Sequence, residues 1–90
     1  MREGSVDVVN QLGLHARAAA QLVRLAARFR STITLRREDS GGFANAKSIL
    51  SVLALAAPRG TRLLLEVEGD DEQEALDAIM GIFATGFGEL

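Results

Sequence analysis

The sequence predicts an α+β fold in which short strands alternate with helices in the order β-α-β-β-α-β-α. Three observations predict it: alternating apolar residues mark the strands, three segments of helix formers each carry one apolar stripe, and glycine or proline separates many of them. Helices with one apolar stripe pack most simply together on one face of a mainly antiparallel sheet. We therefore expect an open-faced two-layer sandwich formed by a single domain, residues 1–90.

The first half of the chain predicts a strand, a helix and a hairpin in that order. Residues 5–9 alternate between apolar and polar side chains, which is the period of a strand with one buried face. Residues 16–29 contain strong helix formers. A second alternating strand over 32–36 leads through a turn at 39–42 into a short strand over 43–46. The apolar stripe of the helix comprises Ala19, Leu22, Val23, Ala26 and Phe29.

The second half predicts a short helix, a strand and a longer helix. The helix over 49–57 stops at Pro58, because proline does not continue a helix. Alternation over 61–68 predicts the fourth strand, and the acidic residues 70–72 favour the start of the last helix. Residues 86–90 are typical of a helix exit. The apolar stripe of this last helix comprises Ala75, Leu76, Ile79, Met80 and Phe83.

Composition narrows the classes of function. The chain has no cysteine and one histidine, so it offers no thiolate nucleophile and little to ligate a metal, and we expect neither metal nor cofactor. A net charge of −2 gives no general attraction to nucleic acid. No apolar run reaches the ~18 residues that span a bilayer, and the N-terminus does not resemble a signal peptide. We expect a cytoplasmic protein that does not insert into a membrane.

The single histidine, His15, is the candidate for chemistry. It lies where a loop leads into the predicted first helix, and the helix start offers free N–H groups and a positive dipole end to an anion. An imidazole titrates near neutrality, so its unprotonated nitrogen is available as a nucleophile. Arg17 adds a guanidinium that suits phosphate oxygens. By themselves these features support anion binding.

Three arginines lie on one side of the same predicted helix. Arg17, Arg24 and Arg28 fall within about 40° of one another at 3.6 residues per turn, and we call them the basic row. Each could be an ordinary solvated side chain. Three positive charges in one row of an acidic protein favour contact with an acidic partner.

Ser48 precedes the short second helix and is well placed to cap it. A serine at a helix start also accommodates phosphorylation, because the helix dipole stabilises the added charge. The two roles are compatible.

The short second helix carries more aliphatic residues than one face of a sheet can cover. Some of them are therefore expected at the surface, although short helices in small folds are often buried on most sides. Exposed apolar patches frequently mark docking sites. The residues in question, called the apolar patch below, are Ile49, Leu50 and Leu53.

Two motifs resemble one known family. Residues 13–19, Gly-Leu-His-Ala-Arg-Ala-Ala, and residues 47–50, Lys-Ser-Ile-Leu, are similar to those of HPr, the histidine-containing phosphocarriers of the bacterial phosphoenolpyruvate-dependent phosphotransferase system. The resemblance covers nearly the entire chain. It implies an open-faced sandwich with a four-stranded antiparallel sheet in the order 1-4-2-3 and three helices on one face.

The resemblance also implies a role for each motif residue. His15 would receive a phosphoryl group on Nδ1 from phosphorylated enzyme I and pass it to sugar-specific A domains. Arg17 would help to hold the phosphate, and we expect the backbone amides of Ala16 and Arg17 to assist. Ser48 would be the serine that HPr kinase/phosphorylase modifies in some bacteria, with transcriptional regulators as further partners. The expected partner-binding residues are Arg24, Arg28, Lys47, Ile49, Leu50 and Leu53.

Such a protein is a phosphoryl-transfer intermediate rather than a turnover enzyme, and we expect it to be a monomer. Two features depart from the family pattern: Ala18 replaces the usual proline, and residues 37–46 form a slightly longer segment. The alternatives are a regulatory or nitrogen-pathway HPr paralogue and, from a different class, an allosteric domain that binds a small anion non-covalently. Nucleic-acid binding ranks last, because the basic row is short and lacks accompanying aromatic residues.

Overall fold

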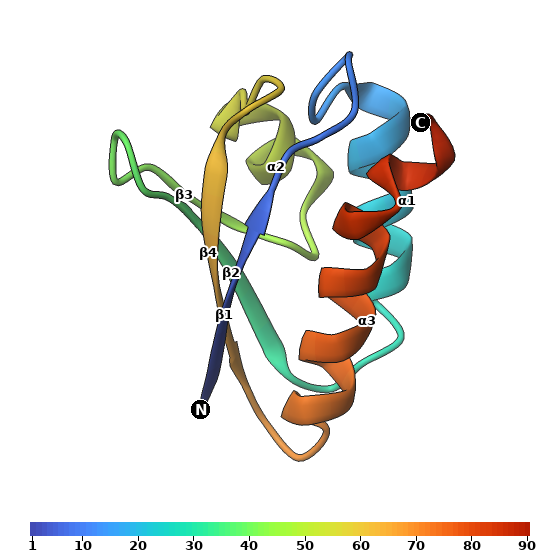
Figure 1. The fold of residues 1–90 in the computed structure, drawn as a ribbon. Coiled ribbons are helices and arrows are strands. Elements are labelled where there is room, and N and C mark those ends of the chain that lie inside the picture. The colour runs from blue at the N-terminus through green and yellow to red at the C-terminus, as the bar shows by residue number, and fades with distance from the viewer.

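The structure, a computed structural model that describes residues 1–90, has the predicted architecture (Figure 1). Three helices cover one face of a four-stranded antiparallel sheet, and the order of elements is the predicted one. The sheet comprises β1 (Arg2–Asp7), β2 (Thr32–Arg37), β3 (Phe43–Asn45) and β4 (Arg62–Glu68), in the order β1-β4-β2-β3. The helices are α1 (Ala16–Ala26), α2 (Ile49–Leu55) and α3 (Glu72–Ala84), followed by the short 3-10 turn η1 (Gly86–Gly88).

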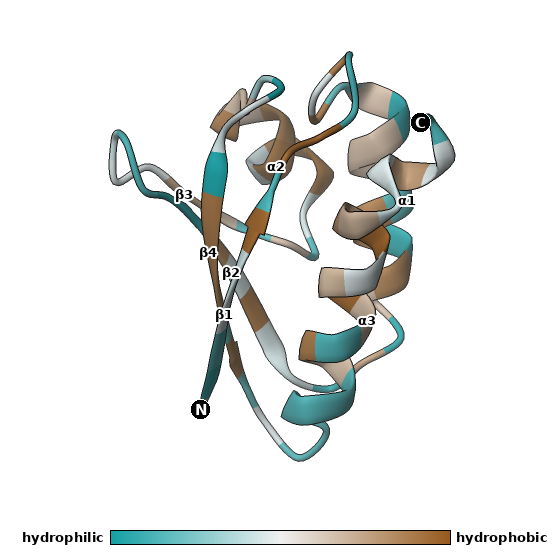
Figure 2. Ribbon diagram, viewed as in Figure 1, coloured by the Kyte–Doolittle hydropathy of each residue, from teal (hydrophilic) through white to brown (hydrophobic).

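The core lies between the sheet and the helices. The central strand β4 pairs with β1 on one side and β2 on the other, so that Leu65 lies opposite Gly4 and Leu35. Buried residues alternate with more exposed ones along β2 and β4, as expected for a sheet that helices cover on one face, and both strands carry apolar residues (Figure 2). Fully buried core residues include Ile33, Leu35, Leu63, Leu65 and Val67 from the sheet, and Leu22, Val52, Ile79 and Phe83 from the helices.

The observed α1 is three residues shorter than predicted. It ends at Ala26 instead of Phe29, because the N–H groups of Arg28 and Phe29 bond to carbonyls three residues back and tighten the chain into a turn. Phe29 and Val23, both predicted on the stripe, are half-buried at the edge of the core.

The first strand and the second helix also differ from the prediction at their ends. β1 begins at Arg2 instead of residue 5, because pairing with β4 extends along its polar start. α2 ends at Leu55 instead of Ala57, where Ala56 adopts a left-handed conformation at φ +53°. The guanidinium of Arg37 then donates hydrogen bonds at 3.1 Å to the carbonyls of Leu55 and Ala56. Arg37, a residue of β2, thus provides hydrogen-bond donors for carbonyl groups at the end of α2.

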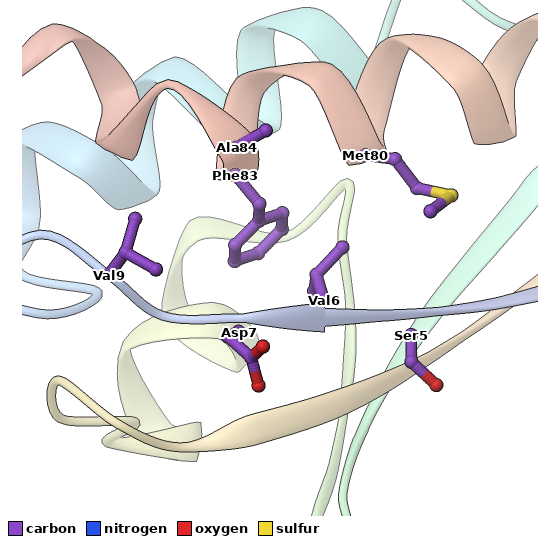
Figure 3. Close-up of a pocket in the computed structure, with 7 residues that line it drawn as sticks. All are labelled: Ser5, Val6, Asp7, Val9, Met80, Phe83 and Ala84. Atoms are coloured by element: carbon purple, nitrogen blue, oxygen red, sulfur yellow. The ribbon is translucent and has the colours of Figure 1, made fainter.

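Met80 is less buried than its place on the α3 stripe predicts. It is 36% exposed, and its sulfur lies against Gly4 of β1. Together with Phe83 it points from α3 toward β1 and borders a pocket of about 230 Å³ between the two elements (Figure 3). Side chains along the seam between α3 and β1 therefore leave a hollow at the surface. No helix is long and apolar enough to span a membrane, and no cluster of residues suitable for a metal is present.

A polar junction fixes the end of the molecule opposite the start of α1. The carboxylate of Asp71 accepts hydrogen bonds from the Ser31 hydroxyl and from the backbone N–H groups of Arg30 and Ser31. These bonds lower the pKa of Asp71 to about 2, and the bond from the Ser31 hydroxyl makes the largest contribution to that shift. The α1–β2 connection is thereby tied to the start of α3.

This junction predicts a pH-dependent contribution to stability. Because the pKa of Asp71 is lowered from its unfolded value of ~3.9, its contribution is complete above that value and is lost as the pH falls toward 2. Asp71→Asn should lower the urea midpoint at pH 7, and the difference from the wild type should shrink between pH 5 and pH 2. Equal urea midpoints for the two proteins at pH 7 would contradict this assignment.

Candidate functional site

His15 occupies the N-cap of α1. Its backbone is extended, with φ −72° and ψ 179°, and its carbonyl accepts the first helical hydrogen bond from Ala19 at 2.8 Å. The imidazole makes no capping bond. The amides of Ala16, Arg17 and Ala18 have no protein partner, so the first turn presents three free N–H groups beside the histidine.

The loop before His15 is fixed by its backbone. The Leu14 N–H donates to the Ala57 carbonyl at 3.0 Å, and the Gly13 N–H donates to the Asn10 carbonyl at 3.1 Å. Gly13 has φ +66°, and a Cβ there would lie 2.7 Å from the Ala57 oxygen. Glycine is therefore required both for its conformation and for the close approach of two backbones.

The C-terminal turn brings a carboxylate to the imidazole. His15 Nε2 lies 2.6 Å from Glu89 Oε2, while Asn10 Nδ2 donates to Glu89 Oε1 at 2.9 Å. The His15 side chain is 24% exposed and that of Glu89 is 14% exposed. Nδ1 of His15 has no hydrogen-bond partner. The histidine therefore has one engaged ring nitrogen and one free ring nitrogen.

The neighbours of Glu89 keep it ionised. The hydrogen bond from Asn10 is the largest cause of its lowered pKa, burial opposes the shift, and His15 and Arg17 add to it. An ionised carboxylate can only accept hydrogen bonds. In neutral His15, Nε2 must then be the donor in this contact.

Sequence reasoning missed both Glu89 and Asn10. The sequence predicts residues 86–90 only as a helix exit, and it places Asn10 only in the segment between the predicted first strand and first helix. One available signal was topological: in the predicted order, α3 runs antiparallel to α1, so its end lies near the start of α1. The polar residues at these two places were therefore candidates for a shared site.

The basic row is divided between two places. Arg17 is exposed, forms no ion pair, and borders a hollow of about 300 Å³ that is also lined by Gln11, Leu12 and Glu89. Arg24 and Arg28 are exposed and line a separate hollow on the side of α1. Arg28 lies in the turn beyond the helix rather than in the helix itself. Arg17 alone belongs to the surroundings of His15.

Ser48 caps α2, as predicted, because its hydroxyl accepts a hydrogen bond from the Ser51 N–H at 3.3 Å. Lys47, expected to bind partners, is half-buried and donates from Nζ to the Phe29 carbonyl at 2.7 Å. That bond joins the start of α2 to the turn after α1, so the ammonium group of Lys47 already has a structural contact.

The apolar patch is exposed, as the sequence predicts. Leu50 is 78% exposed and Ile49 and Leu53 are each 37% exposed, while Val52 and Leu55 face the core. Figure 2 shows α2 as apolar over most of its length. α2 contacts α1 and lies at the same end of the molecule as the start of α1 (Figure 1). The patch and His15 therefore share one end of the fold.

The fold and the site define a class: a small open-faced α+β sandwich that presents one histidine at a helix start beside free amides and an arginine, as histidine phosphocarriers do. The comparisons agree with that class. The family described as the PTS HPr component phosphorylation site matches residues 2–85. The chain belongs to the HPr family, the phosphocarriers of the phosphotransferase system.

Individual relatives match over nearly their whole length. The phosphocarrier protein HPr of Cupriavidus necator is 45% identical, covering 99% of this chain and 98% of that protein. The phosphocarrier protein NPr of Proteus mirabilis is 43% identical, covering 93% of this chain and 92% of that protein. The crystal structure of HPr-C-His from Thermoanaerobacter tengcongensis aligns with a TM-score of 0.92 at 38% identity, covering 100% of this chain and 99% of that one.

The close approach of the Gly13 and Ala57 backbones predicts that a methyl group added at Gly13 lowers the stability of the fold more than one added at an open glycine position. Gly13→Ala should lower the free energy of unfolding by about 2–3 kcal/mol, since it adds a clash with the Ala57 carbonyl to left-handed strain. Gly41→Ala is the matched control: its φ is +76° but nothing lies within 4 Å, so strain alone should cost about 1 kcal/mol. Urea denaturation measures both, and equal losses would argue against the clash.

Proposed function

We propose that this protein accepts a phosphoryl group on His15 Nδ1 from phosphorylated enzyme I and passes it to sugar-specific A domains. The observation that carries the proposal is the arrangement around the ring: Nε2 is engaged by Glu89, while Nδ1 is free at a helix start. Partial exposure supports access by two different large partners in turn.

The surrounding groups suit the charge of a phosphoryl group in transfer. The Nδ1 lone pair attacks phosphorus as the bond from phosphorus to the donor's nitrogen breaks, and that electron pair stays with the donor. The amides of Ala16 and Arg17 and the guanidinium of Arg17 would stabilise the phosphoryl oxygens. None of these groups has to break an existing protein contact to do so.

The docking surface in this proposal combines two chemistries at the His15 end. The apolar patch would bury its exposed side chains against each partner, and Arg24 and Arg28 would attract acidic residues. Lys47 would contribute less, since its ammonium group is bonded to Phe29. We expect the protein to act as a monomer in the cytoplasm.

Ser48 would add regulation. A phosphoserine there would place about two negative charges next to the apolar patch, which would weaken docking of partners that bury it and favour partners with basic groups. HPr kinase/phosphorylase and transcriptional regulators are the corresponding partners. The hydroxyl already serves as a cap, so modification would change an existing contact with Ser51.

A nitrogen-related phosphotransferase chain is the second candidate, supported by the 43% identity to the NPr protein. The chemistry on His15 would be the same, and only the donor and acceptor would differ. Phosphorylation rates with sugar-pathway and nitrogen-pathway forms of enzyme I from the same cell would distinguish the two.

The phosphoryl relay is tested directly with enzyme I and phosphoenolpyruvate. The wild type should gain one acid-labile phosphate, His15→Ala should gain none, and Arg17→Ala should be phosphorylated about tenfold more slowly because one phosphate donor is lost. Mass spectrometry at neutral and acid pH gives the measurement. A protein that binds phosphate reversibly without forming a covalent adduct would instead be a small-anion-binding domain.

The docking role of the apolar patch predicts a selective loss of affinity. Leu50→Ala should weaken binding to enzyme I by about 1–2 kcal/mol, roughly a tenfold rise in Kd, through lost apolar burial. Phe43→Ala is the control, since Phe43 is also exposed but its ring lies against Arg36 and borders a hollow lined by sheet residues such as Thr34 and Glu66 rather than by α2. Titration calorimetry measures both, and an equal effect of the two substitutions would remove the patch from the interface.

A further inference from the structure

The C-terminal turn is built to hold a carboxylate against the histidine. We propose that Glu89 is a positioning residue that fixes His15 in the tautomer with hydrogen on Nε2, leaving the Nδ1 lone pair free to attack phosphorus. This inference rests on the proposed function of His15. It concerns a residue that lies 74 positions away in the chain and joins the site only through the fold.

The backbone of the turn supports this role. Gly86, Phe87 and Gly88 adopt three successive positive φ values, +59°, +58° and +75°, and together they direct the chain back toward the start of α1. The Phe87 ring is buried and packs edge-on against Phe83, with ring centroids 5.0 Å apart. A buried aromatic side chain therefore anchors a turn that few sequences could adopt.

Asn10 fixes the orientation of the carboxylate. Its side chain is fully buried and its Nδ2 donates both to the Gly13 carbonyl, at 2.8 Å, and to Glu89 Oε1. The other oxygen, Oε2, is thereby directed at His15 Nε2. The loop that positions the histidine backbone and the group that orients its ring are joined through one amide.

The arrangement has a chemical consequence during transfer. As Nδ1 donates its electron pair to phosphorus, positive charge develops on the ring, and the carboxylate 2.6 Å from Nε2 stabilises it. The proton stays on Nε2 throughout, so no proton has to leave the ring in either direction of transfer. The same contact thus supports both acceptance and release of the phosphoryl group.

Glu89→Gln separates this role from simple packing. If Asn10 continues to donate to the remaining carbonyl oxygen, the new amide NH₂ faces Nε2 and can only donate to it. Nε2 then becomes an acceptor and the ring proton moves to Nδ1. The substitution changes few atoms and keeps the shape of the side chain, yet it should reverse the tautomer.

The first measurement is the ¹⁵N NMR spectrum of ¹⁵N-histidine-labelled, unphosphorylated protein at a pH about two units above the ordinary imidazole pKa of ~6.5. The wild type should show a protonated Nε2 and an unprotonated Nδ1, and Glu89→Gln should shift the balance toward a protonated Nδ1. Glu89→Asp, which keeps the charge, should retain more of the wild-type pattern. Identical tautomers in the wild type and Glu89→Gln would overturn the inference.

The second measurement is the rate of phosphorylation by phosphoramidate, a small donor that needs no docking surface. Glu89→Gln and Glu89→Ala should react about tenfold more slowly than the wild type. A tenfold loss of rate lies at the lower end of the range found when a group that orients a histidine is removed. Glu74→Gln, which alters an exposed carboxylate on α3, is the control and should react at the wild-type rate. Equal rates for the wild type and Glu89→Gln would also overturn the inference.

Failure of the two proposals is distinguishable. If wild-type His15 gained no phosphate from either enzyme I or phosphoramidate, the proposed function would fall, while the NMR comparison would still decide whether Glu89 sets the tautomer. If the wild type were phosphorylated and Glu89→Gln matched it in tautomer and rate, only the role of Glu89 would fall.

Discussion

The pairing of two loops at one end of the sheet is the constraint on which the rest of the site depends. The segment between β1 and α1 bonds along its backbone to the segment between α2 and β4, through Val8 with Gly60 and Thr61 and through Leu14 with Ala57. These bonds set where α1 begins and how close α2 lies to it. The histidine, the free amides and the apolar patch keep their relation because two otherwise irregular segments are held together.

The layers of the fold could be predicted from the sequence because each depends on local periodicity. The alternation over 32–36 and 61–68 predicts that Ile33, Leu35, Leu63 and Leu65 point inward, and all four are fully buried. The ends of elements were predicted less well, because distant groups determine them. The end of α2 illustrates this: the left-handed Ala56 and the guanidinium of Arg37, 18 residues from Leu55, stop the helix before Pro58.

The candidate site likewise has one part that the local sequence predicts and another part that only the fold brings together. His15, Ala16 and Arg17 are neighbours in the chain, so a single local pattern singled them out. The contacts of Glu89 with Asn10 and His15 join residues 79 and 74 positions apart. They depend on a left-handed turn centred on Phe87, a residue type that propensity would not place at positive φ. No local spacing in the sequence indicates that Glu89 lies beside Asn10 and His15.

The location of the two chain ends has a practical consequence for labelling. Residues 1 and 90 lie at opposite ends of the molecule, and Leu90 directly follows the residue that contacts His15 (Figure 1). Anything joined after Leu90, whether an affinity tag, a fluorophore or a fused domain, would emerge beside the imidazole and could obstruct large proteins approaching it. An attachment before Met1 would leave that approach open.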